Sequence, residues 1–402
     1  MTAGPLFLPV RGASIGIALV LLSGVIAVRA AAPHRPTSDD EVVETLPARA
    51  ADPRMRDLDA LRRAWKARPD DVDTAVRLAR HYHALVAAEG DPRYIGYAQA
   101  ALLPWWTQPE PPVQVRVMRA ILLQFSHQFD AAVSDLDAAL RQDPANAEAW
   151  AWRAAIAMVR ADYAVARSAC EQLSRHDTGL IGAACVANVD SVCGRAAAAA
   201  SAIRAALSRH AEASAGERLW VLTRLAEIEE RRGELRAAED AYRQALSLGI
   251  EDGYLLAAYA DFLLDRQRPA EVIALLQDKT RSDLLLLRLA LAAKQSASPA
   301  LAAWEAELAA RFDAARARGD SLHQKEEARF ALGVQGQAAR ALALARENFV
   351  LQREPADARI LLEAAIAAKQ PGAAEPALQW LAASRIESSI LAALAHKLRG
   401  GA

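Results

Sequence analysis

Apolar and polar positions along the middle of the chain recur with a period of 34 residues. When residues 113–144 are placed over residues 147–178, most apolar positions fall on apolar positions. The matched pairs include Ala120 with Ala154, Phe129 with Tyr163, Ala132 with Ala166, and Leu136 with Cys170. The period predicts two consecutive copies of a helix-turn-helix unit. Such a unit buries its apolar face only by stacking on a neighbour.

Small residues extend this repeat in both directions. A small side chain is expected where the two helices of a unit cross most closely, since a larger one would force them apart. At the start of the second helices these positions are Ala98, Ala132, Ala166, Ala199, Ala238 and Val272, with spacings of 34, 34, 33, 39 and 34 residues. The small residues expected to face them from the first helices are Ala79, Ala120, Ala154, Ala187, Ala226 and Ala260. The series predicts an array that occupies most of the chain.

The composition favours helices throughout the periodic segments, because alanine is abundant there and Gly, Pro and β-branched residues are sparse. The sequence contains no strand pattern, so we expect an all-α protein. The net charge is −1, from 48 basic and 49 acidic residues. Nucleic acid is not an expected partner, because it would require a basic face.

Residues 225–246 carry a family signature. Its elements are Leu225-Ala226-Glu227, Arg232-Gly233-Glu234, Ala238-Glu239, Tyr242 and Ala245-Leu246. This segment closely resembles the tetratricopeptide repeat (TPR) family, whose units usually end as Asp143-Pro144 does here. The resemblance implies an α-solenoid of about eight or nine stacked antiparallel helical hairpins in a right-handed superhelix. Clear repeats span residues 55–282, and divergent TPR-like repeats with a cap follow over residues 283–402.

The resemblance also implies a binding surface. In the TPR family the first helices line a concave groove that takes an extended peptide or a helix of a partner protein. Carried over by position, the groove residues of this chain are Trp220, Glu227, Glu230, Arg231, Tyr254, Asp261 and Asp265. An acidic floor with two aromatic anchors would suit a basic or helical segment of a partner protein. The alternative is that these charges form a solvated face without a partner.

The first 54 residues differ from the array. Residues 13–28 carry no charge, and small residues suited to cleavage follow at 30–32. This run predicts a signal peptide or an N-terminal membrane anchor over residues 1–32, and both alternatives stay open. Residues 33–54 are expected to form a flexible linker. We therefore expect a bacterial exported protein, periplasmic or anchored in the inner membrane, with membrane contact only through this segment.

Three cysteines lie close together in the central repeats. Cys170 falls midway along a second helix, and Cys185 falls in the next first helix, at a height that brings the two together across one seam. Export would make a disulfide between them chemically relevant. Cys193 lies roughly 12 Å beyond Cys185 on the same helix and cannot pair with it. The sequence leaves a Cys170–Cys185 disulfide and buried free thiols as alternatives.

The sequence contains no catalytic motif, phosphate-binding loop or metal-ligand motif. We therefore predict a non-enzymatic protein-interaction scaffold of the cell envelope, with no cofactor and no metal. One alternative is an enzyme with a site in residues 283–384, where His323, Glu326, Glu327 and Arg329 form a dense polar group. The other is a purely structural, self-associating array.

Overall fold

The computed structural model describes residue 38 and residues 53–319 and 324–400. The predicted signal peptide or anchor (residues 1–32) and nearly all of the predicted linker lie outside the described residues. The described ranges contain helices and no strand, which confirms the predicted all-α fold. In those same ranges, no helix is both long and apolar enough to cross a bilayer.

Residues 53–209 form a single helix followed by four antiparallel hairpins, here called the N-terminal arc. Its helices are α1 (Pro53–Ala67), α2 (Val72–Glu89), α3 (Arg93–Ala101), α4 (Leu103–Trp106), α5 (Val113–Phe125), α6 (Phe129–Gln142), α7 (Ala147–Val159), α8 (Tyr163–His176), α9 (Leu180–Ser191) and α10 (Ala196–Arg209). The hairpins pair α2 with α3, α5 with α6, α7 with α8, and α9 with α10. Helix α5 packs on both α2 and α7, so first helices lie side by side as an inner layer.

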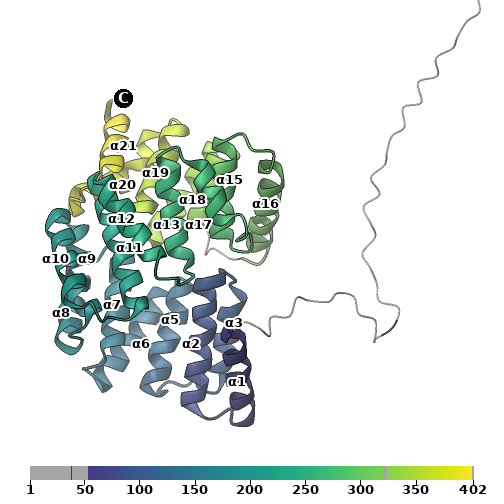
Figure 1. Cartoon of the computed structure of the whole chain (residues 1–402), viewed down its shortest axis with the longest axis vertical. Helices are drawn as coiled ribbons and strands as arrows, with labels where there is room; N and C mark the ends of the chain where they lie inside the picture. The colour runs from purple at the N-terminus through teal and green to yellow at the C-terminus, as the bar shows by residue number, and fades with distance from the viewer. Residues whose placement is uncertain (1–37, 39–52, 320–323, 401–402) are drawn as a thin grey trace, which may run out of the picture. The chain divides into compact units, whose positions relative to one another are not determined.

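Residues 215–400 continue the array and close it into a ring. Its elements are α11 (Ala215–Arg232), α12 (Leu235–Leu246), α13 (Gly253–Asp265), α14 (Pro269–Leu276), α15 (Asp283–Gln295), α16 (Leu301–Ala317), α17 (Gln324–Gly333), α18 (Ala338–Leu351), α19 (Pro355–Ala367), the 3₁₀ helix η2 (Pro371–Ala374), α20 (Glu375–Ser384) and α21 (Ser389–Gly400). The inner helices α11, α13, α15, α17, α19 and α21 pack in that order, and α21 packs back on α11. Figure 1 shows the yellow α21 beside the teal α11. We call this part the C-terminal ring.

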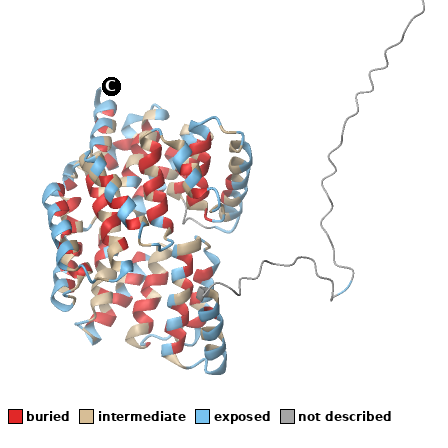
Figure 2. Ribbon diagram, viewed as in Figure 1, coloured by how far each residue is buried: buried red, intermediate tan, exposed pale blue. Residues whose placement is uncertain are grey.

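The small residues singled out by the repeat are buried where the helices of each hairpin cross. All twelve have exposed fractions between 0 and 5%. Ala132 and Ala166, at the start of two second helices, are fully buried. Figure 2 shows buried residues along the inner helices and exposed faces on outer helices such as α8, α10 and α16. The alanine series therefore sets the close approach on which the stacking depends.

Local capping residues set the helix boundaries. Ser214 and Glu217 form a reciprocal capping box at the start of α11, in which the Ser214 side chain accepts from the Glu217 N–H. Asn146 caps α7 by accepting from the Ala149 N–H at 3.0 Å. Helix α11 ends at Gly233, whose φ of 83° is left-handed and favours glycine. These caps fix the start of α7 and both ends of α11.

The arc and the ring contact each other along the ends of their inner helices. Helix α2 packs against α13. The Arg353 N–H, in the loop between α18 and α19, donates to the Val159 carbonyl at the end of α7 at 2.8 Å. The Ala196 N–H donates to the Glu387 carboxylate at 3.0 Å. Hairpins far apart in sequence therefore share one interface.

Candidate functional site

The predicted groove residues lie on the inner surface of the C-terminal ring. All seven come from α11 and α13, since Trp220, Glu227 and Glu230 lie on the first helix and Tyr254 and Asp261 on the second. Arg231 and Asp265 complete the set. Closure of the ring places Asp261 opposite α15 and α17, and Asp265 opposite α19. The acidic floor therefore faces helices of the same chain.

Asp261 is bound by two arginines of the ring. Arg288 of α15 donates to it at 2.7 Å, and Arg329 of α17 donates at 2.8 Å. Burial by itself raises the pKa of Asp261, but the charges and hydrogen bonds of the two arginines outweigh burial and hold that pKa below its ordinary value. Asp261 is therefore ionised and already neutralised.

Asp265 is bound across the ring by Arg359. Both terminal nitrogens of the guanidinium donate to the carboxylate, at 2.6 and 2.7 Å, and the two residues stand 94 positions apart. Arg359 Nε also donates to Glu363 at 2.7 Å. A two-point arginine–carboxylate pair is the strong form of this interaction. The chain itself supplies the positive charge that the sequence analysis assigned to a partner.

Glu230 carries a shifted pKa in the same interior. Burial raises the pKa of Glu230 to about 7, and the negative charges of Asp265 and Asp261 act in the same direction. The Tyr242 hydroxyl donates to Glu230 at 3.1 Å, which opposes the shift. Protonation of Glu230 near neutral pH therefore changes the charge balance of the ring interior.

Tyr254 is the accessible member of the predicted groove. Its exposed fraction is 49%, and the Arg224 guanidinium lies 4.5 Å from its ring centroid. Its hydroxyl donates to Glu227 at 2.5 Å, and Arg224 also pairs with Glu227 at 3.1 Å. Desolvation of the hydroxyl nevertheless raises the pKa of Tyr254. Trp220, the other expected anchor, is half-buried against the apolar core of the ring.

Arg231 differs from the other arginines on this surface. One of its terminal nitrogens donates to Ser191 Oγ at 3.0 Å. No carboxylate of the described residues lies within 4.0 Å of its guanidinium nitrogens. Its Nε is buried without a hydrogen-bond partner among those residues. Burial lowers the pKa of Arg231, although the Glu227 charge opposes this.

The arginines that fill the groove were not predicted from the sequence. Arg288, Arg329 and Arg359 lie in the divergent hairpins, where the repeat signature is weak. One signal was available for α19. Arg359 and Glu363 stand four residues apart, so the sequence places them on one face of α19. The sequence therefore shows opposite charges on α13 and α19, but it does not show that they contact each other.

Three of the four residues of the enzymatic alternative, Glu326, Glu327 and Arg329, are engaged in ion pairs within the ring. Glu327 is buried and pairs with Arg316 and Arg340. Arg329 binds Asp261, and His323 lies outside the described residues. Within the part of the chain that the structure describes, no group of three or more His, Cys, Asp or Glu side chains could hold a metal ion.

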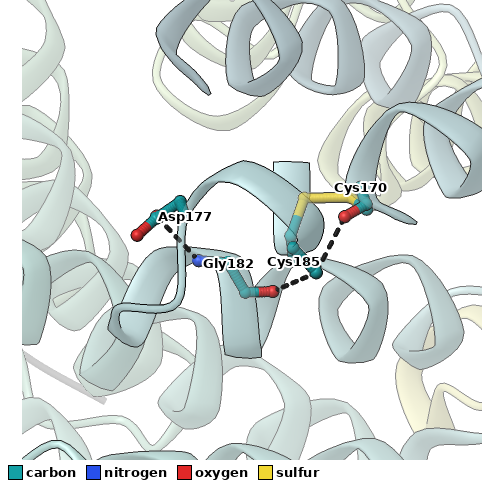
Figure 3. The surroundings of a disulfide bond; sticks show 5 residues. Cys170, Asp177, Gly182 and Cys185 are labelled. Atoms are coloured by element: carbon teal, nitrogen blue, oxygen red, sulfur yellow. Dashed lines mark hydrogen bonds between the residues drawn. A yellow bond between two sulfur atoms is a disulfide. The ribbon is translucent and has the colours of Figure 1, made fainter. Parts of the chain in front are cut away.

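A disulfide joins Cys170 of α8 to Cys185 of α9, with the two Cα atoms 5.3 Å apart. Figure 3 shows this bond beside the turn between the two helices, where the Gly182 N–H donates to the Asp177 carboxylate at 3.1 Å. A Cβ at Gly182 would lie 2.0 Å from the Asp177 carbonyl oxygen, so only glycine fits there. Cys193 is a half-buried free thiol, and burial raises its pKa.

Comparisons with known proteins identify similar structures but no similar sequence. No protein-family model matches the chain, and no curated protein sequence matches it. Similar structures include the APC/C hetero-tetramer Cut9–Hcn1, with 11% identity and a TM-score of 0.41 over 86% of this chain and 52% of that chain. Yeast Tom70 has 15% identity and a TM-score of 0.43 over 86% and 62%. A human IFIT1 dimer with m7Gppp-AAAA has 13% identity and a TM-score of 0.44 over 83% and 86%. The chain thus spans about half of the first of these chains and less than two thirds of the second.

Proposed function

We propose that the protein is a non-enzymatic protein-interaction scaffold of the cell envelope. In this proposal a peptide or helix of a partner protein binds the inner surface of the N-terminal arc, formed by α2, α5 and α7. Stacked helical hairpins present such an extended inner surface. We place the partner on the arc rather than on α11 and α13, because Asp261 and Asp265 already bind arginines of the ring.

One observation carries this choice. Arg80 of α2 pairs with both carboxylate oxygens of Glu148 of α7, across α5, and their side chains keep exposed fractions of 42% and 37%. Beside this pair, the Gln114 side chain donates to Asp73 at 3.1 Å. Exposed ion pairs contribute little to stability, about 0–1 kcal/mol. A partner can therefore replace these contacts at low cost, unlike the buried pairs of the ring.

The arc also offers an aromatic contact. The rings of His83 of α2 and Trp152 of α7 meet edge to face, with centroids 6.2 Å apart. Burial lowers the pKa of His83, which favours the neutral imidazole. Both side chains are half-buried and keep some accessible surface. A peptide that lies between α2 and α7 would contact polar and aromatic groups together, as is common at protein interfaces.

The envelope location rests on two features. The uncharged run of residues 13–28 is typical of an export signal or anchor. The Cys170–Cys185 disulfide suits an oxidising compartment. Protease added to spheroplasts should degrade an exported chain, and full protection would overturn this part of the proposal.

Site-specific crosslinking in the native host tests the partner surface. A photoreactive amino acid is placed at Gln114 on the inner face or, as the matched control, at the exposed Arg141 on α6. We expect one non-self protein to be trapped at position 114 and not at position 141, with lower yield when Arg80→Glu is added. Equal yields at both positions, or self-adducts alone, would refute a partner site on the arc.

A further inference from the structure

Two hydrogen-bond donors lack acceptors where α8, α9 and α11 approach one another. The first is Arg231, whose Nε–H is buried without a partner among the described residues. Among the described residues, the guanidinium donates to Ser191 Oγ, at 3.0 Å. Ser191 is fully buried and already donates its own proton to the Asn188 carbonyl at 2.7 Å. The guanidinium is thus held in position by a neutral group and keeps unused donors.

The second donor is the Tyr163 hydroxyl at the start of α8. Its oxygen accepts a hydrogen bond from Trp380 Nε1 of α20 at 3.0 Å. In the described part of the chain, its own proton has no acceptor. Burial raises the pKa of Tyr163 to about 12, so the hydroxyl keeps this proton at neutral pH. Helices α8 and α9 pair as an antiparallel hairpin, so Tyr163 at the start of α8 lies at the same end of the hairpin as Ser191 at the end of α9, to which Arg231 donates.

The acceptors near these donors are already used. Glu227 accepts from Tyr254 and pairs with Arg224. Glu354, whose charge also acts on Tyr163, accepts a backbone N–H at the start of α19 in a capping box. Neither carboxylate pairs with Arg231 in the described residues, and a buried donor without an acceptor is costly.

We propose that Arg231 and Tyr163, with Ser191 behind them, form a binding site for an oxyanion, meaning a phosphate or carboxylate group. We call these three residues the donor site. Two oxygens of such a group would accept from the Arg231 guanidinium and from the Tyr163 hydroxyl, which satisfies both donors and neutralises the charge. The donor site lies where α8 and α9 of the arc meet α11 and α20, away from the arc surface proposed for a protein partner. Either proposal can fail without the other.

Calorimetric titration of the full chain with inorganic phosphate and with acetate, at ionic strength held constant by chloride, tests the donor site. We expect saturable binding of at least one of the two anions. Arg231→Gln should weaken this binding by at least about tenfold, because charge-assisted hydrogen bonds are lost. Arg231→Lys keeps the charge but loses the planar guanidinium. Its anion affinity should therefore lie between those of the wild type and Arg231→Gln. Tyr163→Phe should weaken binding by roughly threefold or more, since one neutral hydrogen bond is lost.

Arg266→Gln is the matched control. Arg266 also has a buried Nε without a partner among the described residues, but its guanidinium lies over the Phe262 ring, at 5.7 Å. Its replacement should leave anion affinity unchanged. An acidic peptide in place of acetate distinguishes a carboxylate carried by a protein from a free anion. The proposal is overturned if the wild-type chain binds none of the three ligands, or if helical Arg231→Gln and Tyr163→Phe variants bind as well as wild type.

Discussion

Replacing Glu230 by glutamine should stabilise the protein at alkaline pH and change little at acid pH. Glu230 is confined in the ring interior with Asp265 and Asp261, and burial raises its pKa to about 7 from an ordinary value of 4.5. Glutamine has nearly the same shape and keeps an oxygen that accepts from the Tyr242 hydroxyl. The substitution therefore removes the titration and preserves the packing.

The magnitude follows from the pKa difference. Between about 4.5 and about 7 the folded state holds a proton that the unfolded state has released, so the free energy of unfolding falls as pH rises through this window. The full difference, at about 1.4 kcal/mol per pH unit, amounts to about 3 kcal/mol. Above pH 7 Glu230 is ionised in both the folded and the unfolded state, and the wild-type protein is destabilised by the full difference. Relative to wild type, Glu230→Gln should gain about 3 kcal/mol between about pH 4 and about pH 8.

Urea unfolding followed by far-UV circular dichroism at those two pH values measures this gain. Glu171→Gln, on the exposed face of α8, is the control and should change stability equally at both. The reasoning is refuted if the Glu230→Gln gain is the same at both pH values. It is also refuted if the variant is destabilised as pH rises, because the sign would then be that of a carboxylate stabilised by ionisation.

Three further predictions concern the disulfide, the ring and the hairpin crossing. Joint replacement of Cys170 and Cys185 by alanine should lower the free energy of unfolding by about 3 kcal/mol, because the crosslink closes a loop with a sequence separation of 15 residues; chemical denaturation of both chains measures it. Asp265→Asn should cost about 1–3 kcal/mol, because it leaves Arg359 half-buried with a weakened partner; faster hydrogen exchange in α13 and α19 would show the ring loosening. Ala166→Leu should cost about 1–3 kcal/mol by overpacking a fully buried position, as measured by thermal unfolding.

Matched variants separate these effects from general damage. Cys193→Ala should leave stability nearly unchanged, because that thiol is in no disulfide. Ala164→Leu, on the exposed face of the same helix as Ala166, should also be tolerated. Equal melting temperatures for Ala166→Leu and Ala164→Leu would contradict the close crossing of α7 and α8. Wild-type exchange rates in Asp265→Asn would show that this pair does not hold the ring closed.

The hairpin architecture could be predicted because it depends on neighbours in sequence. Helices of one hairpin cross where Ala154 and Ala166 meet, and the requirement for a small side chain leaves a periodic trace. The disulfide alternative could be stated for the same reason, since Cys170 and Cys185 lie in consecutive helices. In each case a spacing of a few tens of residues implies a contact.

The sequence could not predict that arginines of the same chain occupy the candidate groove. Asp265 and Arg359 carry opposite charges, but nothing local in the sequence indicates that the two approach within hydrogen-bond distance across 94 residues. The donor site is similar, because Tyr163 receives its hydrogen bond from Trp380, 217 residues away. Each such contact depends on the curvature accumulated over many hairpins.

The sequence by itself determined the helices and their pairing into hairpins, because both follow from short-range periodicity and side-chain size. The tertiary structure alone decided that the C-terminal hairpins close into a ring and that arginines of α15, α17 and α19 neutralise the expected groove of α13. The physical reason is that a small rotation between neighbouring repeats is set by packing details at every interface, and their sum decides whether a solenoid stays open or meets itself.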